Sequence, residues 1–133
     1  MKLSGCLLLV LWLTAGAACA QGCNEHAGAA CLHGFELPGS AGRLQYYSSR
    51  QAGEGDGPRA VLVVLHGHPR DAGRSFQAGL QAARAAGRLD DTLVVAPLFQ
   101  VPQAQAERCR SSGEPSAQAG DALWSCGARC RLD

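Results

Sequence analysis

The sequence predicts an α/β fold that combines an N-terminal hairpin, one strand–helix–strand unit and an irregular, Cys-containing C-terminal segment. Two short apolar runs, at residues 60–65 and 92–96, have the length and composition of buried strands. Between these runs apolar residues recur at helical spacing, and the pattern ahead of them is that of a hairpin. A hairpin followed by a strand, a helix and a strand is typical of the α/β class.

The hairpin and the first apolar run have clear local signals. Phe35 and Leu37 alternate with other residues, residues 38–42 supply the Pro and Gly of a turn, and residues 44–48 form the return strand. The run at 60–65 contains no polar residue. A wholly apolar strand is typical of burial on both faces, so we expect a central strand in a helix-covered sheet.

The ends of the predicted helix and of the second apolar strand are also marked. Asp71 or Ser75 can cap the start of the helix, and Gly87 can end it in the left-handed conformation. The second strand, at 92–96, is followed directly by Pro97. Because proline donates no backbone hydrogen bond, we expect the strand to stop there.

The N-terminus has the features of a secretory signal. Lys2 is followed by an apolar stretch at 7–13, which is too short to span a bilayer, and small residues precede Ala20. We expect cleavage after Ala20, a secreted or periplasmic protein, and no membrane span once the leader is removed. An uncleaved anchor and a lipid attached to Cys19 are the alternatives, although Gly16 differs from the lipoprotein pattern.

The remainder of the chain divides into an α/β part at 21–99 and a loop-rich part at 100–133, with a short helix expected near 103–108. The chain has 12 basic and 11 acidic residues, a net charge of +1. No basic surface is implied, so a nucleic-acid partner is not expected.

Removal of the leader leaves five cysteines, which in an exported protein favour disulfides. Cys23 and Cys31 close a short loop and make one candidate pair. Cys109 and Cys126 flank a polar loop and make a second, which leaves Cys130 without a partner. The connectivity is not determined by the sequence.

The residues that follow the first apolar run are the candidate functional loop. In VLVVLHGHPRDAG (61–73), His66, Gly67 and His68 come directly after the strand, at the end where α/β folds place their sites. This stretch resembles the strand-then-His-Gly segment of α/β-hydrolase-fold serine hydrolases. TLVVAPLF (92–99) resembles their next strand, and the resemblance covers residues 35–99.

The resemblance implies an oxyanion loop. Gly67 and the backbone N–H of His68 would lie beside the oxyanion, and His66 would brace the turn. Members of the family hydrolyse small-molecule esters, or peptide-like amides, through an acyl-serine intermediate and need no metal or organic cofactor.

The catalytic residues of that family have no counterpart in the sequence. The nucleophile motif G-x-S-x-G does not occur, because GRSFQ at 73–77 has Gln77 in the place of the second Gly. We therefore expect the amino-terminal part of an esterase-like hydrolase, truncated before its nucleophile and inactive by itself. The strand at 61–65 would then have one open edge, through which the chain would self-associate.

Three alternatives remain open. His66 and His68 could ligate the metal of a metal-dependent hydrolase fragment. The chain could instead be a small disulfide-bonded binding module that uses Tyr46 and Tyr47 as a contact surface. In the third alternative His66 only pairs with buried backbone groups and His68 is exposed.

Overall fold

The structure is a computed structural model that describes residues 22–40, 42–51, 57–67, 69–106 and 114–124. The expected leader at 1–20, His68 and the candidate pair Cys109–Cys126 lie outside the described residues. Among the helices that the structure describes, none has the length and apolar character needed to cross a bilayer.

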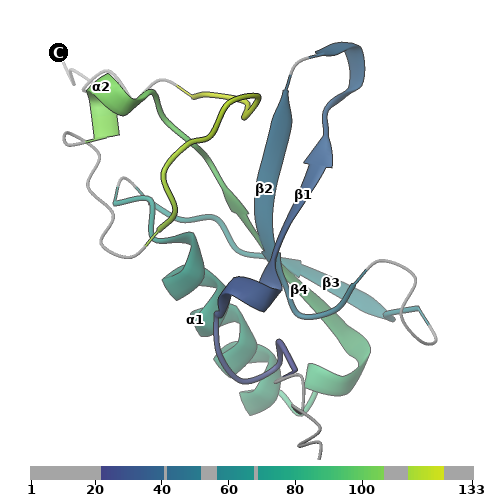
Figure 1. The fold of residues 1–133 in the computed structure, drawn as a ribbon. Coiled ribbons are helices and arrows are strands. Elements are labelled where there is room, and N and C mark those ends of the chain that lie inside the picture. The colour runs from purple at the N-terminus through teal and green to yellow at the C-terminus, as the bar shows by residue number, and fades with distance from the viewer. Residues whose placement is uncertain (1–21, 41, 52–56, 68, 107–113, 125–133) are drawn as a thin grey trace, which may run out of the picture.

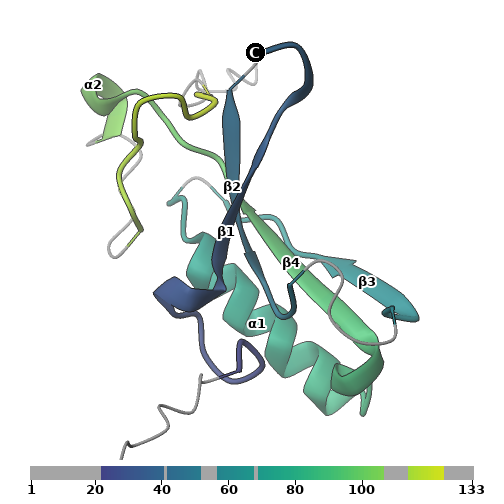
Figure 2. The same cartoon turned by 45° about the vertical axis from the view of Figure 1, so that its right-hand side comes forward.

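The described residues form a small α/β protein with a mixed sheet, as the sequence predicts. Its four strands are β1 (Leu32–Glu36), β2 (Arg43–Ser48), β3 (Ala60–Val63) and β4 (Thr92–Leu98). They lie in the order β1-β2-β4-β3, with β3 and β4 parallel and the other neighbours antiparallel. One long helix, α1 (Ala72–Ala85), connects β3 to β4 and packs on one side of the sheet (Figures 1 and 2).

The β1–β2 hairpin confirms the predicted turn. Its register runs from Leu32 opposite Tyr47 to Glu36 opposite Arg43. Gly39, with a φ of 72°, and Gly42, with a φ of 99°, adopt the left-handed conformation that other residues avoid.

The core lies between α1 and the sheet. Phe76 and Leu80 of α1 are fully buried, as is Val94 of β4. Gly79 faces the sheet so closely that an added Cβ would lie 2.8 Å from methyl groups of Val64 and Val94. The helix therefore packs against the sheet at a distance that only glycine allows at this position.

The C-terminal end of α1 is as predicted, whereas its N-terminal cap is not. Gly87 follows the helix with a φ of 65°. The side chain of Asp71 makes no capping hydrogen bond, and Ser75 lies inside the helix. The Gly73 N–H instead donates to Oε1 of Glu114 over 2.6 Å, so the cap comes from a residue 41 positions away.

The expectation that the first apolar strand is central and buried on both faces is wrong. β3 is at the edge of the sheet, and β4 is its one partner among the described residues (Figure 2). Val61, Val63 and Leu65 are 59%, 56% and 64% exposed. An apolar sequence makes burial favourable, but it does not supply the second layer that would bury these side chains. The predicted open edge is thus present in the described part of the chain.

The second apolar strand continues beyond the predicted stop. Pro97 lies inside β4, which ends at Leu98. The Val64 N–H donates to the Val95 carbonyl over 2.8 Å. Val95, and every second residue of β4 counted from it, therefore turns its backbone groups toward β3. Pro97 shares that orientation, and pairing with β3 ends at Val95. The missing N–H removes the one ladder bond that residue 97 could donate, to the Val64 carbonyl, and β4 continues past it through its pairing with β2.

The N-terminal segment is tied to itself and to α1. The structure contains the predicted disulfide between Cys23 and Cys31. The Ala27 N–H donates to Oε1 of Gln77 over 3.2 Å, and Nε2 of Gln77 donates to the Glu25 carbonyl over 2.7 Å. The disulfide loop is thus fixed to α1, and its Cys31 belongs to the buried core.

The C-terminal segment at 114–124 lies across the end of the sheet. A short helix, α2 (Gln103–Ala106), follows β4 in the region where one is predicted. Two isolated parallel bridges attach the segment to β2 and to the end of β4, at Arg43–Asp121 and Gln100–Leu123.

Candidate functional site

His66 joins the loop after β3 to the end of β4. Its Nε2 accepts a hydrogen bond from the Phe99 N–H over 3.1 Å, and its Nδ1 lies 2.8 Å from the Gly67 carbonyl. Because a carbonyl can only accept, Nδ1 carries the proton, and the ring is the neutral Nδ1–H tautomer. His66 therefore holds the loop in place, and this geometry fits both the bracing role and the purely structural alternative.

Gly67 is held through its carbonyl. That oxygen accepts from Nδ1 of His66 and from the Arg70 N–H, the latter over 3.1 Å, which closes a turn. The Gly67 N–H has no acceptor among the described residues, and Gly67 itself is exposed. Its φ is not in the left-handed region, and the nearest atom to an added Cβ is Cδ of Pro69 at 3.7 Å. Nothing in the described residues requires glycine at this position.

Arg70 is a second clamp on the same loop. It is 7% exposed and has a φ of 55°, a conformation uncommon for a residue with a side chain. Its Nε donates to the Phe99 carbonyl over 3.0 Å, and its Nη2 donates to Oε1 of Gln100 over 2.7 Å. Burial lowers the pKa of this guanidinium, and the negative charge of Glu114 acts in the opposite direction. These bonds compensate for the backbone strain.

The C-terminal segment at 114–124 contacts both Tyr47 and Gln100, the partner of Arg70. Nε2 of Gln100 donates to the Pro115 carbonyl over 3.1 Å. Oε2 of Glu114 accepts from the hydroxyl of Tyr47 over 3.1 Å. Burial, together with the charge and hydrogen bond of Glu114, raises the pKa of Tyr47 to about 12. The segment therefore fixes both the loop and the start of α1.

Aromatic rings lie beside the loop. The ring of Phe99 is 5.1 Å from that of His66 and 4.7 Å from that of Trp124, measured between centroids. Trp124 is 49% exposed and Leu65 is 64% exposed. The loop therefore borders an apolar surface.

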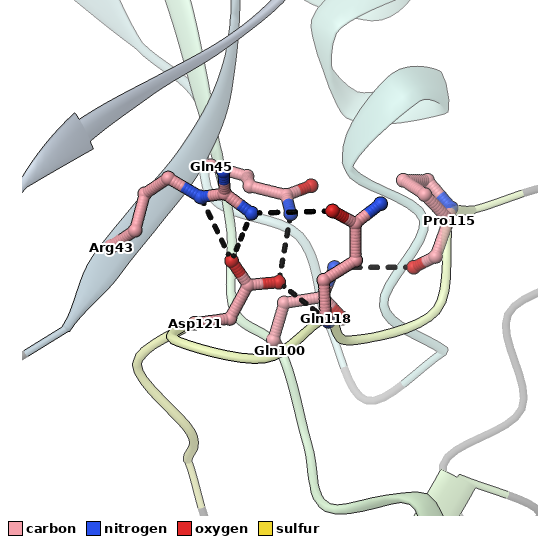
Figure 3. A network of polar contacts seen from close by, with 6 residues as sticks. All are labelled: Arg43, Gln45, Gln100, Pro115, Gln118 and Asp121. Atoms are coloured by element: carbon pink, nitrogen blue, oxygen red, sulfur yellow. Dashed lines mark hydrogen bonds and ion pairs between the residues drawn. The ribbon is translucent and has the colours of Figure 1, made fainter.

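A second polar cluster surrounds Asp121, and Figure 3 shows it together with Gln100 and Pro115. Its carboxylate accepts from Nε and Nη2 of Arg43, from Nε2 of Gln45 and from the Gln118 N–H. Burial alone would raise the pKa of Asp121, but these hydrogen bonds and the charge of Arg43 together hold it below its usual value. The carboxylate thus attaches the C-terminal segment to β2.

A small open hollow of about 210 Å³ lies beside this cluster, on the same side of the hairpin. Its lining consists of side chains and backbone from β1, β2 and the C-terminal segment: Leu32, His33, Gly34, Arg43, Gln45, Pro115 and Gln118. Oε1 of Gln45, one of these lining residues, is buried and has no hydrogen-bond partner among the described residues.

The structure brings His66 and Gly67 together at the predicted place, whereas His68 lies outside the described residues. Sequence reasoning missed Gln100 and Glu114 as partners of the loop and of α1. Neither residue belongs to a motif, and their contacts join segments 30 and 41 positions apart. The one usable signal is that Arg70, Gln100 and Glu114 are polar residues that the fold must pair if it buries them.

Of the three alternatives, the purely structural one fits the two hydrogen bonds of His66 as well as an oxyanion loop does. In the described residues there is no group of three or more His, Cys, Asp or Glu side chains that could hold a metal ion. Both ring nitrogens of His66 already make hydrogen bonds. Tyr47 is 7% exposed and stacks on Phe76 at 5.8 Å, so the expected contact surface of Tyr46 and Tyr47 is wrong with respect to Tyr47.

The fold and the clamped loop define a small α/β protein with a four-stranded mixed sheet and one covering helix. No family model matches the chain, and no curated protein or solved structure matches it either.

Proposed function

We propose that the chain is the amino-terminal part of an exported α/β-hydrolase-type serine hydrolase, in which the loop after β3 supplies oxyanion-binding amides. The parent reaction is the hydrolysis of a carboxylic ester, or of a peptide-like amide, through an acyl-serine intermediate. The chain by itself is proposed to be inactive, because its sequence contains no G-x-S-x-G motif.

The observation that carries the proposal is the state of Gly67. Its carbonyl is fixed by two hydrogen bonds, and the N–H of this exposed residue has no acceptor in the described residues. Neither backbone conformation nor neighbouring atoms require glycine there. A glycine that the chain itself does not need is suited to the close approach of a ligand. The fixed Gly67 carbonyl belongs to the peptide group that carries the His68 N–H, the donor proposed for the oxyanion, and oxyanion binding demands a fixed donor.

Two further features support the same proposal. The loop lies at the carboxyl end of the parallel pair β3–β4, where α/β sheets bind ligands. The disulfide between Cys23 and Cys31 is in keeping with export to an oxidising compartment, as the leader at 1–20 predicts.

The test begins with the DNA that follows the coding region. We expect a reading frame that encodes an apolar strand followed by G-x-S-x-G. The extended protein should react with a serine-directed fluorophosphonate and hydrolyse p-nitrophenyl esters, whereas the present chain should do neither.

In the extended protein, Gly67→Val should lower kcat by about 100-fold, because the bulky side chain blocks the approach of the carbonyl oxygen. Gly57→Val is the matched control, since an added Cβ at Gly57 has no neighbour within 4 Å. An extended protein that fluorophosphonate does not label, or equal activity of the two variants, would contradict the proposal.

A further inference from the structure

Arg70 has a backbone conformation that the described part of the chain otherwise gives only to glycine. Its φ is 55°, and the other described residues with a φ in the left-handed region are Gly39, Gly42, Gly87 and Gly120. A side chain makes this conformation unfavourable, because the Cβ crowds the neighbouring backbone. The position therefore favours glycine, and the presence of arginine indicates that its side chain has a task there.

Burial of the Arg70 guanidinium is also unfavourable in itself. The residue is 7% exposed, and the two groups that accept its side-chain hydrogen bonds, the Phe99 carbonyl and the Gln100 side-chain amide, are uncharged. Among the described residues no carboxylate lies within ion-pair distance of it, and the charge of Glu114 acts on it only from farther away. A buried charge without an opposite partner is unfavourable. Fold stability alone therefore does not account for an arginine at this position.

Arg70 and His66 bind the two backbone groups of one residue, Phe99, which follows β4. The Phe99 N–H donates to Nε2 of His66 over 3.1 Å, and the Phe99 carbonyl accepts from Nε of Arg70 over 3.0 Å. Gly67 lies between His66 and Arg70 in the chain. The loop therefore cannot slide along Phe99 without the loss of at least one bond, and its position relative to β4 is set at both ends.

The backbone of Arg70 transmits this restraint to Gly67. The Arg70 N–H donates to the Gly67 carbonyl over 3.1 Å, while its Nη2 donates to Oε1 of Gln100 over 2.7 Å. Gln100 is fixed in turn, because its Nε2 donates to the Pro115 carbonyl (Figure 3). The Gly67 carbonyl and the His68 N–H belong to one planar peptide group, so a restraint on the carbonyl orients the N–H as well.

We propose that Arg70 is a positioning residue, which holds the Gly67 peptide group in the orientation that an oxyanion requires. The inference rests on the proposed function, because the loop needs a fixed orientation only if its amides bind a reacting group. Oxyanion donors act by being fixed before the charge develops, and a misplacement of about 1 Å can lower a rate about 100-fold. A strained, buried arginine is unfavourable for the fold but provides this fixation, since its planar guanidinium reaches two acceptors at once.

The loop is tested by NMR relaxation of the backbone amides in the present protein, expressed from its full sequence, with the order parameter of the Gly67 N–H as the readout. In the wild type we expect a value of about 0.85, which is typical of rigid backbone. Arg70→Gly keeps the backbone conformation accessible and removes the clamp, so the value should fall to about 0.6 or below. The N–H groups of Leu80 and Val94, in the core, should keep their wild-type values.

Two further variants define what the clamp needs. Arg70→Lys keeps the positive charge, but one ammonium cannot replace a guanidinium that bridges two acceptors, so the order parameter of Gly67 should lie between those of wild type and Arg70→Gly. Arg74→Gln, at an exposed position of α1, is the matched control and should leave it unchanged. A wild-type value for Gly67 in either Arg70 variant, or an equal loss of order at Leu80 and Val94, would overturn the proposal.

Kinetics of the extended protein separate this inference from the proposed function. Arg70→Gly should lower kcat for p-nitrophenyl esters by about 10- to 100-fold and leave KM within about threefold, because a misplaced donor affects the transition state rather than the bound substrate. A loss of folded protein would instead reduce the number of active sites, which titration with fluorophosphonate measures. Wild-type kcat in an Arg70→Gly protein that fluorophosphonate labels would overturn this inference and leave the proposed function intact. An extended wild type that is not labelled would overturn both.

Discussion

Nε2 of His66 accepts the backbone N–H of Phe99 over 3.1 Å, and this bond joins the end of β3 to the end of β4 beyond the last paired residues of the two strands. The imidazole replaces a ladder hydrogen bond at the point where the two strands diverge. The position of the following loop therefore depends on one side chain.

Replacement of His66 by Ala should leave the Phe99 N–H without its partner and lower the free energy of unfolding by about 1–2 kcal/mol. Exchange of the Phe99 amide proton, followed by NMR, should become at least tenfold faster. His33→Ala is the control, because His33 lies on β1 and has no hydrogen bond to this loop among the described residues. Unchanged protection of Phe99 in His66→Ala would show that the ring does not hold the loop.

Two glycines with opposite surroundings test the packing of α1. In Gly79→Ala the new methyl would lie 2.8 Å from methyl groups of Val64 and Val94, so the helix must move away from the sheet. Overpacking costs about 1–3 kcal/mol, which exceeds the gain of about 1 kcal/mol in helix propensity. Gly67→Ala has open space and should change stability by less than about 0.5 kcal/mol.

Chemical denaturation of both variants checks this pair. We expect a lower midpoint for Gly79→Ala and an unchanged midpoint for Gly67→Ala. A more stable Gly79→Ala protein would mean that helix propensity outweighs the close contact and that the spacing between α1 and the sheet is not fixed.

Local signals predict the elements of this fold because they depend on neighbours in the sequence. The hairpin turn needs left-handed glycines at Gly39 and Gly42, and Gly87 ends α1 for the same reason. The strands β3 and β4 are short apolar runs that lie where they are predicted. The two errors at these strands have a common source. The residues of a strand show whether it can be buried, but not which other elements lie beside it. The exposure of β3 and the continuation of β4 through Pro97 both depend on neighbours from distant segments.

In the candidate site, too, features with a local sequence signal are predictable, and contacts with distant segments are not. The loop at His66 and Gly67 is predicted from its place after an apolar strand. The cap of α1 is not, because Asp71 is a good capping residue by type and its side chain makes no cap. The carboxylate of Glu114 acts there instead, and no sequence pattern connects Glu114 with Gly73.

Tyr47 should make stability depend on alkaline pH. Its pKa is raised from 10.0 to about 12 by burial and by Glu114, so between these pH values the unfolded chain has lost a proton that the folded chain retains. The free energy of unfolding should therefore be independent of this group below pH 10 and should fall as the pH rises from 10 to 12.

Tyr47→Phe should remove that part of the pH dependence and lose about 1 kcal/mol at neutral pH, because Glu114 loses a donor. Tyr46→Phe is the control and should retain the alkaline slope. Urea unfolding at pH 9, 10 and 11 measures the difference. Parallel slopes for wild type and Tyr47→Phe would show that the buried hydroxyl does not govern this range.

Asp121 should have the opposite effect at acid pH. Its pKa is held below 3.8 in the folded chain, so the unfolded chain binds a proton first as the pH falls. The stabilisation is complete above about pH 4 and is lost as the pH decreases through the folded-state value.

Asp121→Asn places an amide N–H₂ opposite donors of Gln45 or Arg43, and it should cost about 2–3 kcal/mol at pH 7. The stability curves of wild type and variant should converge toward pH 2, while Asp90→Asn, at an exposed carboxylate, should follow the wild type. If the curves remain parallel from pH 7 to pH 2, Asp121 is not the group whose ionisation attaches the C-terminal segment to β2.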